Sequence, residues 1–126
     1  MTDGVMVVDD DDDIRETISQ LLERHGYDVV TAAHGGEAMQ RLRQGDHPSL
    51  ILLDLMMPYV SGEEFRRMQL ADVAVASIPV VLLSGAGRVE QIAERMSVEV
   101  LHKPIELSKL VETVKRFCAA PTPRKH

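Results

Sequence analysis

Short apolar runs that alternate with helical patterns are the feature of this sequence that most constrains its fold. Three runs are continuous and have the length of a strand, at residues 5–8, 50–53 and 80–83, and each ends at a polar residue. Such runs are typical of strands buried on both faces of a parallel sheet. Two weaker runs, at residues 27–31 and 98–101, contain an acidic side chain, which a central strand does not readily tolerate. We therefore expect these two strands at the edges of the sheet.

Between these runs the apolar residues recur at the spacing of an α-helix. Asp13 with Glu16 suggests a capping box at the start of the first helix. Strands that alternate with helices form a parallel sheet through right-handed crossovers. The expected fold class is therefore α/β, a doubly wound five-stranded parallel sheet with five helices distributed over both of its faces. The predicted helices lie at residues 14–22, 37–43, 63–69, 89–96 and 107–117.

The length of 126 residues suits one domain that buries its own core. We place that domain at residues 4–118 and interpret residues 119–126, which contain two prolines, as a C-terminal tail or a cut linker. A net charge of −6 argues against direct DNA binding. Cys118 is the single cysteine, and the sequence has neither a long apolar run nor a signal peptide. These features predict a cytoplasmic protein without a disulfide or a membrane segment.

The residues that follow the strands carry the chemistry, because ligands of an open parallel sheet bind at the carboxyl ends of its strands. Asp9 and Asp10 follow the first run, Asp54 follows the third, Ser84 the fourth, and Lys103 comes soon after the fifth. Two unit charges 4 Å apart interact by ~4 kcal/mol at an effective dielectric of about 20, so three neighbouring carboxylates need positive charge among them. Lys103 and a divalent ion such as Mg²⁺ or Mn²⁺ can supply it. One carboxylate can then attack phosphorus and become an acyl phosphate.

Four motifs, in this order along the chain, resemble those of a known family. They are Val-Val-Asp-Asp at residues 7–10, Leu-Leu-Asp-Leu-Met-Met-Pro at 52–58 with Gly62, Leu-Leu-Ser-Gly at 82–85, and His-Lys-Pro at 102–104. Together they resemble the receiver domain of response regulators in two-component signal transduction, in its single-domain form similar to chemotaxis regulators. The likeness covers residues 5–117. It implies a flavodoxin-like sheet with the strand order 2-1-3-4-5.

The resemblance also implies a phosphorelay function rather than an enzyme that acts on other substrates. Asp54 would take a phosphoryl group from a phosphohistidine on a histidine kinase or a histidine phosphotransfer domain, and the domain would catalyse only its own phosphorylation and slow dephosphorylation. Lys103 would pair with the phosphoryl group, Ser84 would hydrogen-bond it, and the peptide before Pro104 would be cis. Phosphorylation would change the affinity for an unknown downstream protein. The implied metal ligands are Asp9, Asp10, Asp54 and the backbone carbonyl of Met56.

Three features depart from the family pattern. Val100 stands where the family usually has a Tyr or Phe that swings inward on phosphorylation, so switching without this aromatic side chain is an open point. The stretch from Ser84 to Lys103 is short for the family, which predicts a short fourth helix or a tight loop beside it. Met56 and Ala86 occupy the two variable positions that flank the phosphoryl group in the family, and neither side chain can hydrogen-bond an attacking water. Slow self-dephosphorylation is the expected consequence.

Other interpretations stand beside this one. The acidic run at residues 9–13 can be a solvated loop or a set of helix caps, and an EF-hand that begins at Asp9 fails because its glycine and glutamate positions are not filled. Residues 85–87 superficially match a dinucleotide-binding turn, which leaves a cofactor-dependent enzyme as an alternative from another class. Ser84 can be a plain helix cap and Lys103 a surface charge. Within the family, a stand-alone carrier, a domain cut from a larger protein and an unphosphorylated pseudo-receiver stay open, and the intact acidic residues disfavour the last.

Overall fold

The computed structural model describes residues 4–85, 87 and 89–118. The strands in this part of the chain are β1 (Gly4–Val8), β2 (Asp28–Ala32), β3 (Leu50–Asp54), β4 (Val80–Ser84) and β5 (Glu99–His102). The helices are α1 (Asp12–Arg24), α2 (Gly35–Arg43), α3 (Gly62–Leu70), α4 (Val89–Met96) and α5 (Leu107–Phe117). Every predicted element is present, and α4 is short, as predicted. The predicted tail at residues 119–126 and the flanking position Ala86 lie outside the described residues.

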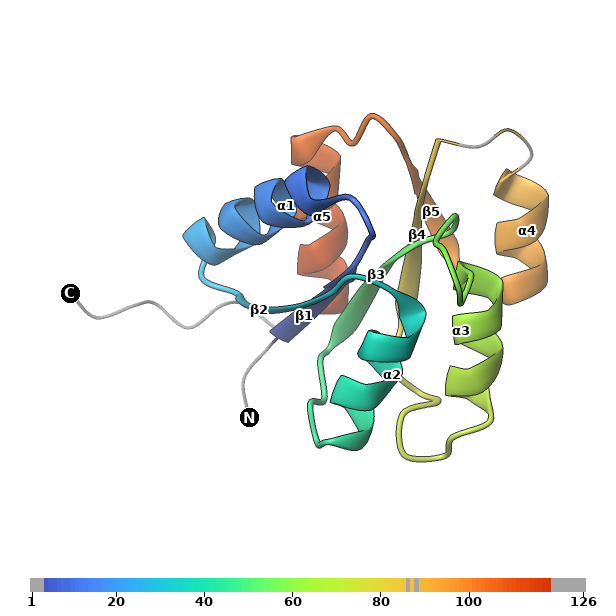
Figure 1. Cartoon of the computed structure of the whole chain (residues 1–126). Helices are drawn as coiled ribbons and strands as arrows, with labels where there is room; N and C mark the ends of the chain where they lie inside the picture. The colour runs from blue at the N-terminus through green and yellow to red at the C-terminus, as the bar shows by residue number, and fades with distance from the viewer. Residues whose placement is uncertain (1–3, 86, 88, 119–126) are drawn as a thin grey trace.

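The five strands form one parallel sheet in the order β2-β1-β3-β4-β5, which confirms the predicted fold class, the strand order and the two edge strands. β1 and β3 are neighbours at its centre, with Val5 opposite Leu50 and Val8 opposite Leu53. Helices α2, α3 and α4 cover one face, and α1 and α5 cover the other (Figure 1). Since all the strands run in one direction, their carboxyl ends meet at one edge of the sheet.

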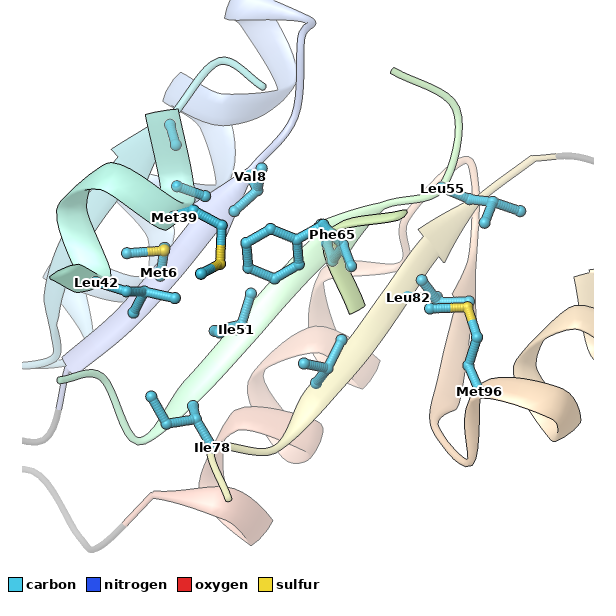
Figure 2. Packing of buried hydrophobic residues seen from close by; sticks show 14 of the residues in the cluster. Met6, Val8, Met39, Leu42, Ile51, Leu55, Phe65, Ile78, Leu82 and Met96 are labelled. Atoms are coloured by element: carbon cyan, nitrogen blue, oxygen red, sulfur yellow. The ribbon is translucent and has the colours of Figure 1, made fainter. Parts of the chain in front are cut away.

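A hydrophobic core lies on each face, and the alternation of side chains along the central strands supplies both. Ile51 of β3 packs on the α2–α4 side, whereas its neighbour Leu52 packs on the α1–α5 side. Figure 2 shows the first core, in which the fully buried ring of Phe65 points toward Met39. Full burial of each large apolar side chain contributes about 1.5–3 kcal/mol, so these two cores hold the sheet and its polar edge in place. Among the described residues, no helix combines the length and the apolar character that crossing a membrane requires.

The start of α1 differs from the sequence-based prediction. Asp11 is the N-cap, and its carboxylate accepts hydrogen bonds from the backbone N–H groups of Asp13 and Ile14 at 2.9 and 3.2 Å. The predicted capping box of Asp13 with Glu16 is therefore wrong, because α1 begins at Asp12 and both residues lie inside the helix. Several acidic residues in succession made the choice of cap ambiguous, since each of them is a good N-cap residue.

A buried glutamine ties α3 to the loop that leads into β4. Gln69 has no exposed surface, and its Nε2 donates hydrogen bonds to the carbonyls of Val75 and Ile78 at 3.0 and 2.8 Å. Its Oε1 accepts a hydrogen bond from Nη1 of Arg66 at 2.9 Å. Both ends of the amide are therefore satisfied inside an otherwise apolar region, which is the condition for burying such a group without a large penalty.

We expect Gln69→Met to lower the free energy of unfolding by about 2–4 kcal/mol, because two buried carbonyls and one guanidinium group lose their partner. Urea denaturation monitored by circular dichroism measures this change. Gln40→Met, at an exposed position of α2, is the matched control and is expected to change stability by less than ~0.5 kcal/mol. Equal stabilities of the two variants would show that the Gln69 hydrogen bonds contribute nothing net.

Candidate functional site

The polar residues singled out in the sequence meet at the carboxyl edge of the sheet. Asp9 directly follows β1, Asp54 ends β3 and Ser84 ends β4. Lys103 follows β5, and its backbone N–H donates a hydrogen bond to the carbonyl of Ser84 at 2.9 Å. Since the strands are paired in register, these four residues stand next to one another along the edge.

The Lys103 side chain bridges two buried carboxylates. Its Nζ lies 3.0 Å from Oδ2 of Asp9 and 3.3 Å from Oδ1 of Asp54. Asp9 is fully buried and Asp54 is 4% exposed. Charged groups are rarely buried to this extent unless they are paired, and removing one partner of such a group leaves an uncompensated charge. Lys103 is therefore part of this cluster and not a lone surface charge.

Asp10 completes a set of three carboxylates that suits a divalent cation. Asp9, Asp10 and Asp54 each offer an oxygen, and these oxygens lie within 4.8 Å of one another. Asp10 is exposed, so the set opens to solvent on one side. Oxygen donors with a solvent-facing side fit Mg²⁺, which keeps several of its waters and binds few protein ligands. A single lysine also leaves part of the negative charge of three carboxylates uncompensated, and this excess favours a cation.

Burial raises the pKa of Asp54 from 3.8 to about 7, and the charge of Asp9 adds to this effect. Lys103 acts in the opposite direction and lowers that pKa, whereas a hydrogen bond with Asp10 raises it further. For Lys103 itself, burial favours a lower pKa, but its hydrogen bond with Asp9 and the charges of Asp54 and Asp9 outweigh burial and raise the pKa. The lysine is thus a cation at neutral pH, and ionising Asp54 in its buried position is costly.

An arginine that the sequence analysis did not single out supports Asp9. Nη1 of Arg15 donates a hydrogen bond to the backbone carbonyl of Asp9 at 2.7 Å, and the same guanidinium group pairs with Asp12. The backbone N–H of Asp11 donates to Oδ1 of Asp9 at 2.9 Å. These contacts fix the loop between β1 and α1. The one sequence signal for this role is that Arg15 lies in the first turn of the helix that follows the acidic run.

Ser84 and Met56, the two other site residues near Asp54, differ in their exposure to solvent. Ser84 is 2% exposed, whereas the Met56 side chain is 70% exposed. The backbone N–H of Met56 points toward Asp54 and donates to its Oδ1 at 3.4 Å. The peptide between Lys103 and Pro104 is cis, as the resemblance implied.

The loop that follows Asp54 is closed by its own backbone. The N–H of Gly62 donates to the carbonyl of Leu55 at 3.0 Å, and the N–H of Val60 donates to the carbonyl of Pro58 at 2.8 Å. Tyr59, which lies between Pro58 and Val60, has a φ of 68°. This left-handed backbone conformation is unfavourable for a bulky side chain. Because this loop begins at the phosphoacceptor candidate, its conformation determines what surrounds Asp54.

We expect Gly62→Ala to destabilise the protein by about 2 kcal/mol or more, although alanine favours helices elsewhere. A Cβ at this position would lie 2.9 Å from the carbonyl oxygen of Asp54 and 2.9 Å from the Cα of Leu55, so backbone atoms must shift. Gly87→Ala is the control, because a Cβ there meets nothing within 4 Å. Thermal unfolding of both variants measures the difference. A Gly62→Ala variant as stable as Gly87→Ala would contradict this account of the close approach.

Val100 and His102 lie two residues apart in β5 and face the same side of the sheet, toward α4. Val100 is half-buried against the core under α4 and supplies no aromatic ring at this position. Nε2 of His102 lies 2.8 Å from a carboxylate oxygen of Glu90 at the start of α4, and both side chains are exposed. His102 thus contacts α4 and has no role in the carboxylate cluster.

Comparisons with known proteins agree with one another. Residues 5–115 match the family described as the response regulator receiver domain. The polar-differentiation response regulator DivK of Brucella ovis is 32% identical over 120 residues, which cover 93% of this chain and 97% of DivK. Protein PilG of Pseudomonas aeruginosa is 34% identical over 122 residues, 94% of this chain and 90% of PilG.

Solved structures show the same fold. The crystal structure of a response regulator receiver protein from Pseudomonas putida matches with a TM-score of 0.85 and 31% identity, over 92% of this chain and 98% of that one. The chemotaxis protein CheY4 of Vibrio cholerae matches with a TM-score of 0.84 and 28% identity, over 93% of this chain and 99% of that one. Sequence and backbone therefore point to the same family.

Proposed function

Since the chain belongs to the response regulator receiver domains of two-component signalling, we propose that it accepts a phosphoryl group on Asp54. The proposed donor is a phosphohistidine of a histidine kinase or of a histidine phosphotransfer domain. The observation that carries this proposal is the bridge from Lys103 to two buried carboxylates, Asp9 and Asp54. This arrangement presents a carboxylate nucleophile beside a fixed cation. A cytoplasmic location, shared with such a donor, is part of the proposal.

In the proposed reaction an oxygen of Asp54 attacks the phosphorus of the donor. The bond between phosphorus and the donor imidazole nitrogen breaks as the bond to the Asp54 oxygen forms, and the released nitrogen keeps the electron pair and takes up a proton. Lys103, 3.3 Å from Oδ1 of Asp54, neutralises charge on the phosphoryl oxygens, and Ser84 hydrogen-bonds one of them. The domain then catalyses no reaction other than its own phosphorylation and dephosphorylation.

The metal proposed for this site is Mg²⁺ or Mn²⁺, held by Asp9, Asp10 and Asp54 with the backbone carbonyl of Met56. A bound divalent ion supplies further positive charge for the phosphoryl oxygens. Asp9 and Asp54 are positioned by their strands, whereas Asp10 reaches the cluster from the loop that Arg15 fixes through its hydrogen bond to the Asp9 carbonyl.

A small apolar cavity beside Lys103 suits the phosphodonor. It has a volume of about 260 Å³ and lies between α1 and the start of α5, where Ile14, Pro104 and Ile105 form part of its lining. A donor protein that places an apolar side chain here would bring its phosphohistidine next to Asp54.

Phosphorylation would then move Ser84 and its loop toward the phosphoryl group and change the affinity for a downstream partner. The exposed Met56 side chain and Ala86 offer no hydrogen bond to an attacking water, which supports slow dephosphorylation.

Intact mass spectrometry after incubation with acetyl phosphate and Mg²⁺ tests the proposal. We expect one phosphoryl group on the wild type, and none on Asp54→Asn or on the wild type in EDTA. Asp46→Asn, at a carboxylate outside the cluster, is the matched control and should still be modified. A phosphoryl group that persists on Asp54→Asn would contradict the assignment of the acceptor. No modification of the wild type by acetyl phosphate or by any phosphorylated histidine phosphotransfer domain would indicate a pseudo-receiver.

A further inference from the structure

Helix α3 and the C-terminal half of α4 border an open groove. The two helices lie next to each other on the same face of the sheet (Figure 1). Because they run antiparallel to the strands, their last turns lie toward the opposite edge from Asp54. The groove has a volume of about 500 Å³, within the range of ligand sites. We call it the α3–α4 groove; it is lined by Glu63, Arg66, Arg67, Leu70, Arg95, Met96 and Ser97.

The α3–α4 groove is locally basic on an acidic protein. Three arginines line it against one glutamate, whereas the whole chain has a net charge of −6. Arg67 and Arg95 lie in the last turns of their helices, where cations also stabilise the helix dipole. These two arginines therefore have a local explanation. Arg66 precedes the last turn of α3, so the helix dipole does not explain an arginine at this position.

Arg66 is held in place, and no carboxylate in the described part of the chain pairs with it. Its Nη1 donates to Oε1 of Gln69 at 2.9 Å, and Gln69 is itself fixed by hydrogen bonds to two backbone carbonyls. Its Nε is buried and makes no hydrogen bond, and Arg66 forms no ion pair with any residue that the structure describes. Burial lowers the pKa of its guanidinium group. A preorganised, partly buried guanidinium group that has no counter-ion among the described residues gains from a carboxylate that arrives with a ligand.

The groove already contacts one carboxylate of this chain. Nη2 of Arg95 lies 3.2 Å from Oε2 of Glu63, and both side chains are exposed. An exposed ion pair of this kind contributes only ~0–1 kcal/mol, so a carboxylate from another molecule can replace Glu63 at little cost.

A second hollow continues the groove beyond Arg66 and Ser97. It has a volume of about 400 Å³, and apolar side chains that include Val80, Val98 and Phe117 form much of its lining. Glu94 and Glu99 lie at its exposed rim, and Glu99 is already paired with Arg116. Leu70, in the groove itself, is 52% exposed. A site for a free phosphate ion needs cations that converge on one point. Here the arginines are divided between two helices and alternate with apolar surface. This pattern fits a peptide segment that carries both an acidic and an apolar side chain.

We propose that the α3–α4 groove binds a segment of a partner protein that carries an acidic side chain next to an apolar one. The carboxylate pairs with Arg66 in the positive field of Arg67 and Arg95, and the apolar side chain enters the adjoining hollow. Since none of these residues belongs to the carboxylate cluster, binding does not require phosphorylation of Asp54, and the proposal goes beyond the phosphorelay function.

A random peptide library displayed on phage, selected on the full chain, provides the probe. We expect the selected peptides to share an Asp or Glu adjacent to an apolar residue. Synthesised with a fluorescent label, they should bind Arg66→Gln and Arg67→Gln at least about tenfold more weakly than wild type by anisotropy. Arg43→Gln, an exposed arginine in the last turn of α2, is the matched control and should bind like wild type. Asp54→Asn should also bind like wild type.

Several outcomes would overturn the proposal. Peptides without an acidic residue, or peptides that bind Arg66→Gln and Arg67→Gln like wild type, exclude the charge complementarity. Loss of binding in Asp54→Asn places the peptide at the phosphoacceptor site. Displacement of the peptides by millimolar inorganic phosphate, with saturable phosphate binding that depends on Arg66, identifies a small-anion site in their place. If Arg66→Gln unfolds in urea far below wild type, Arg67→Glu combined with Arg95→Glu, both at exposed positions, gives the decisive affinities.

Discussion

Replacing Lys103 with methionine is expected to slow phosphorylation of Asp54 by acetyl phosphate by about 10²–10³-fold. The ammonium group lies 3.3 Å from Oδ1 of Asp54 and 3.0 Å from Oδ2 of Asp9, so in the proposed reaction it would stand where charge develops on the incoming phosphoryl group. Removing one preorganised donor of this kind typically costs about 3–4 kcal/mol in the transition state. Methionine keeps the length of the side chain and removes its charge. The initial rate, measured by intact mass at saturating Mg²⁺, gives the effect.

Lys103→Met also leaves two buried carboxylates without their cation, so its stability must be measured beside its rate. Urea denaturation at the assay temperature shows whether the variant is folded, and the rate is compared only for folded protein. Lys109→Met, an exposed lysine of α5, is the matched control. If folded Lys103→Met reacts within about threefold of the wild type, Lys103 does not contact the phosphoryl group in the transition state.

The second large effect is a gain of stability in Asp54→Asn without divalent ions. The pKa of Asp54 is about 7 in the folded protein against an ordinary value of 3.8, and burial is the main cause. Below pH ~4 the carboxyl group is protonated in both the folded and the unfolded chain, so it causes no penalty. As the pH rises to about 7, the unfolded chain loses this proton while the folded chain keeps it, and folding stability falls. A difference of about three pKa units corresponds to roughly 4 kcal/mol at most.

Asparagine removes this loss, so in EDTA at pH 8 we expect Asp54→Asn to be about 2–4 kcal/mol more stable than the wild type. At pH 4 the two proteins should differ little. Saturating Mg²⁺ should reduce the difference at pH 8, because under the proposal the ion would bind the folded wild type and offset the repulsion among its carboxylates. Asp28→Asn, at an exposed position of β2, is the control. Equal stability of wild type and Asp54→Asn in EDTA at pH 8 would show that burial of this carboxylate is not costly.

Much of the fold and the cluster of polar residues followed from short local patterns. The continuous apolar runs identified the central strands, and one acidic residue in each weaker run identified the edge strands β2 and β5. Asp9 and Asp54 could be placed together because each comes at the end of a buried strand, and parallel strands end at one edge. The roles of these residues, of Ser84 and Lys103 and of the metal remain proposals that the phosphorylation experiments address.

The contacts made by helices were harder to anticipate. The N-cap of α1 was misplaced among consecutive acidic residues, and Arg15, which holds the Asp9 carbonyl, was not recognised. Gln69 would have been expected at a surface from its polarity, yet it is fully buried because two loop carbonyls need its amide. The position of those carbonyls depends on the turns between α3 and β4, which follow no simple periodicity.

The sequence by itself determined the order of strands and helices and the residues at the carboxyl edge of the sheet. A residue that follows a buried strand is placed there by the strand, whichever way the helices rotate. Only the tertiary structure decided that Arg66 meets Gln69 and that α3 and α4 leave a groove lined with arginines. A shift of one residue turns a helical side chain by about 100°, so its neighbours depend on how the helices pack against the sheet and against each other. That packing is set by the two cores as a whole, and no local pattern contains it.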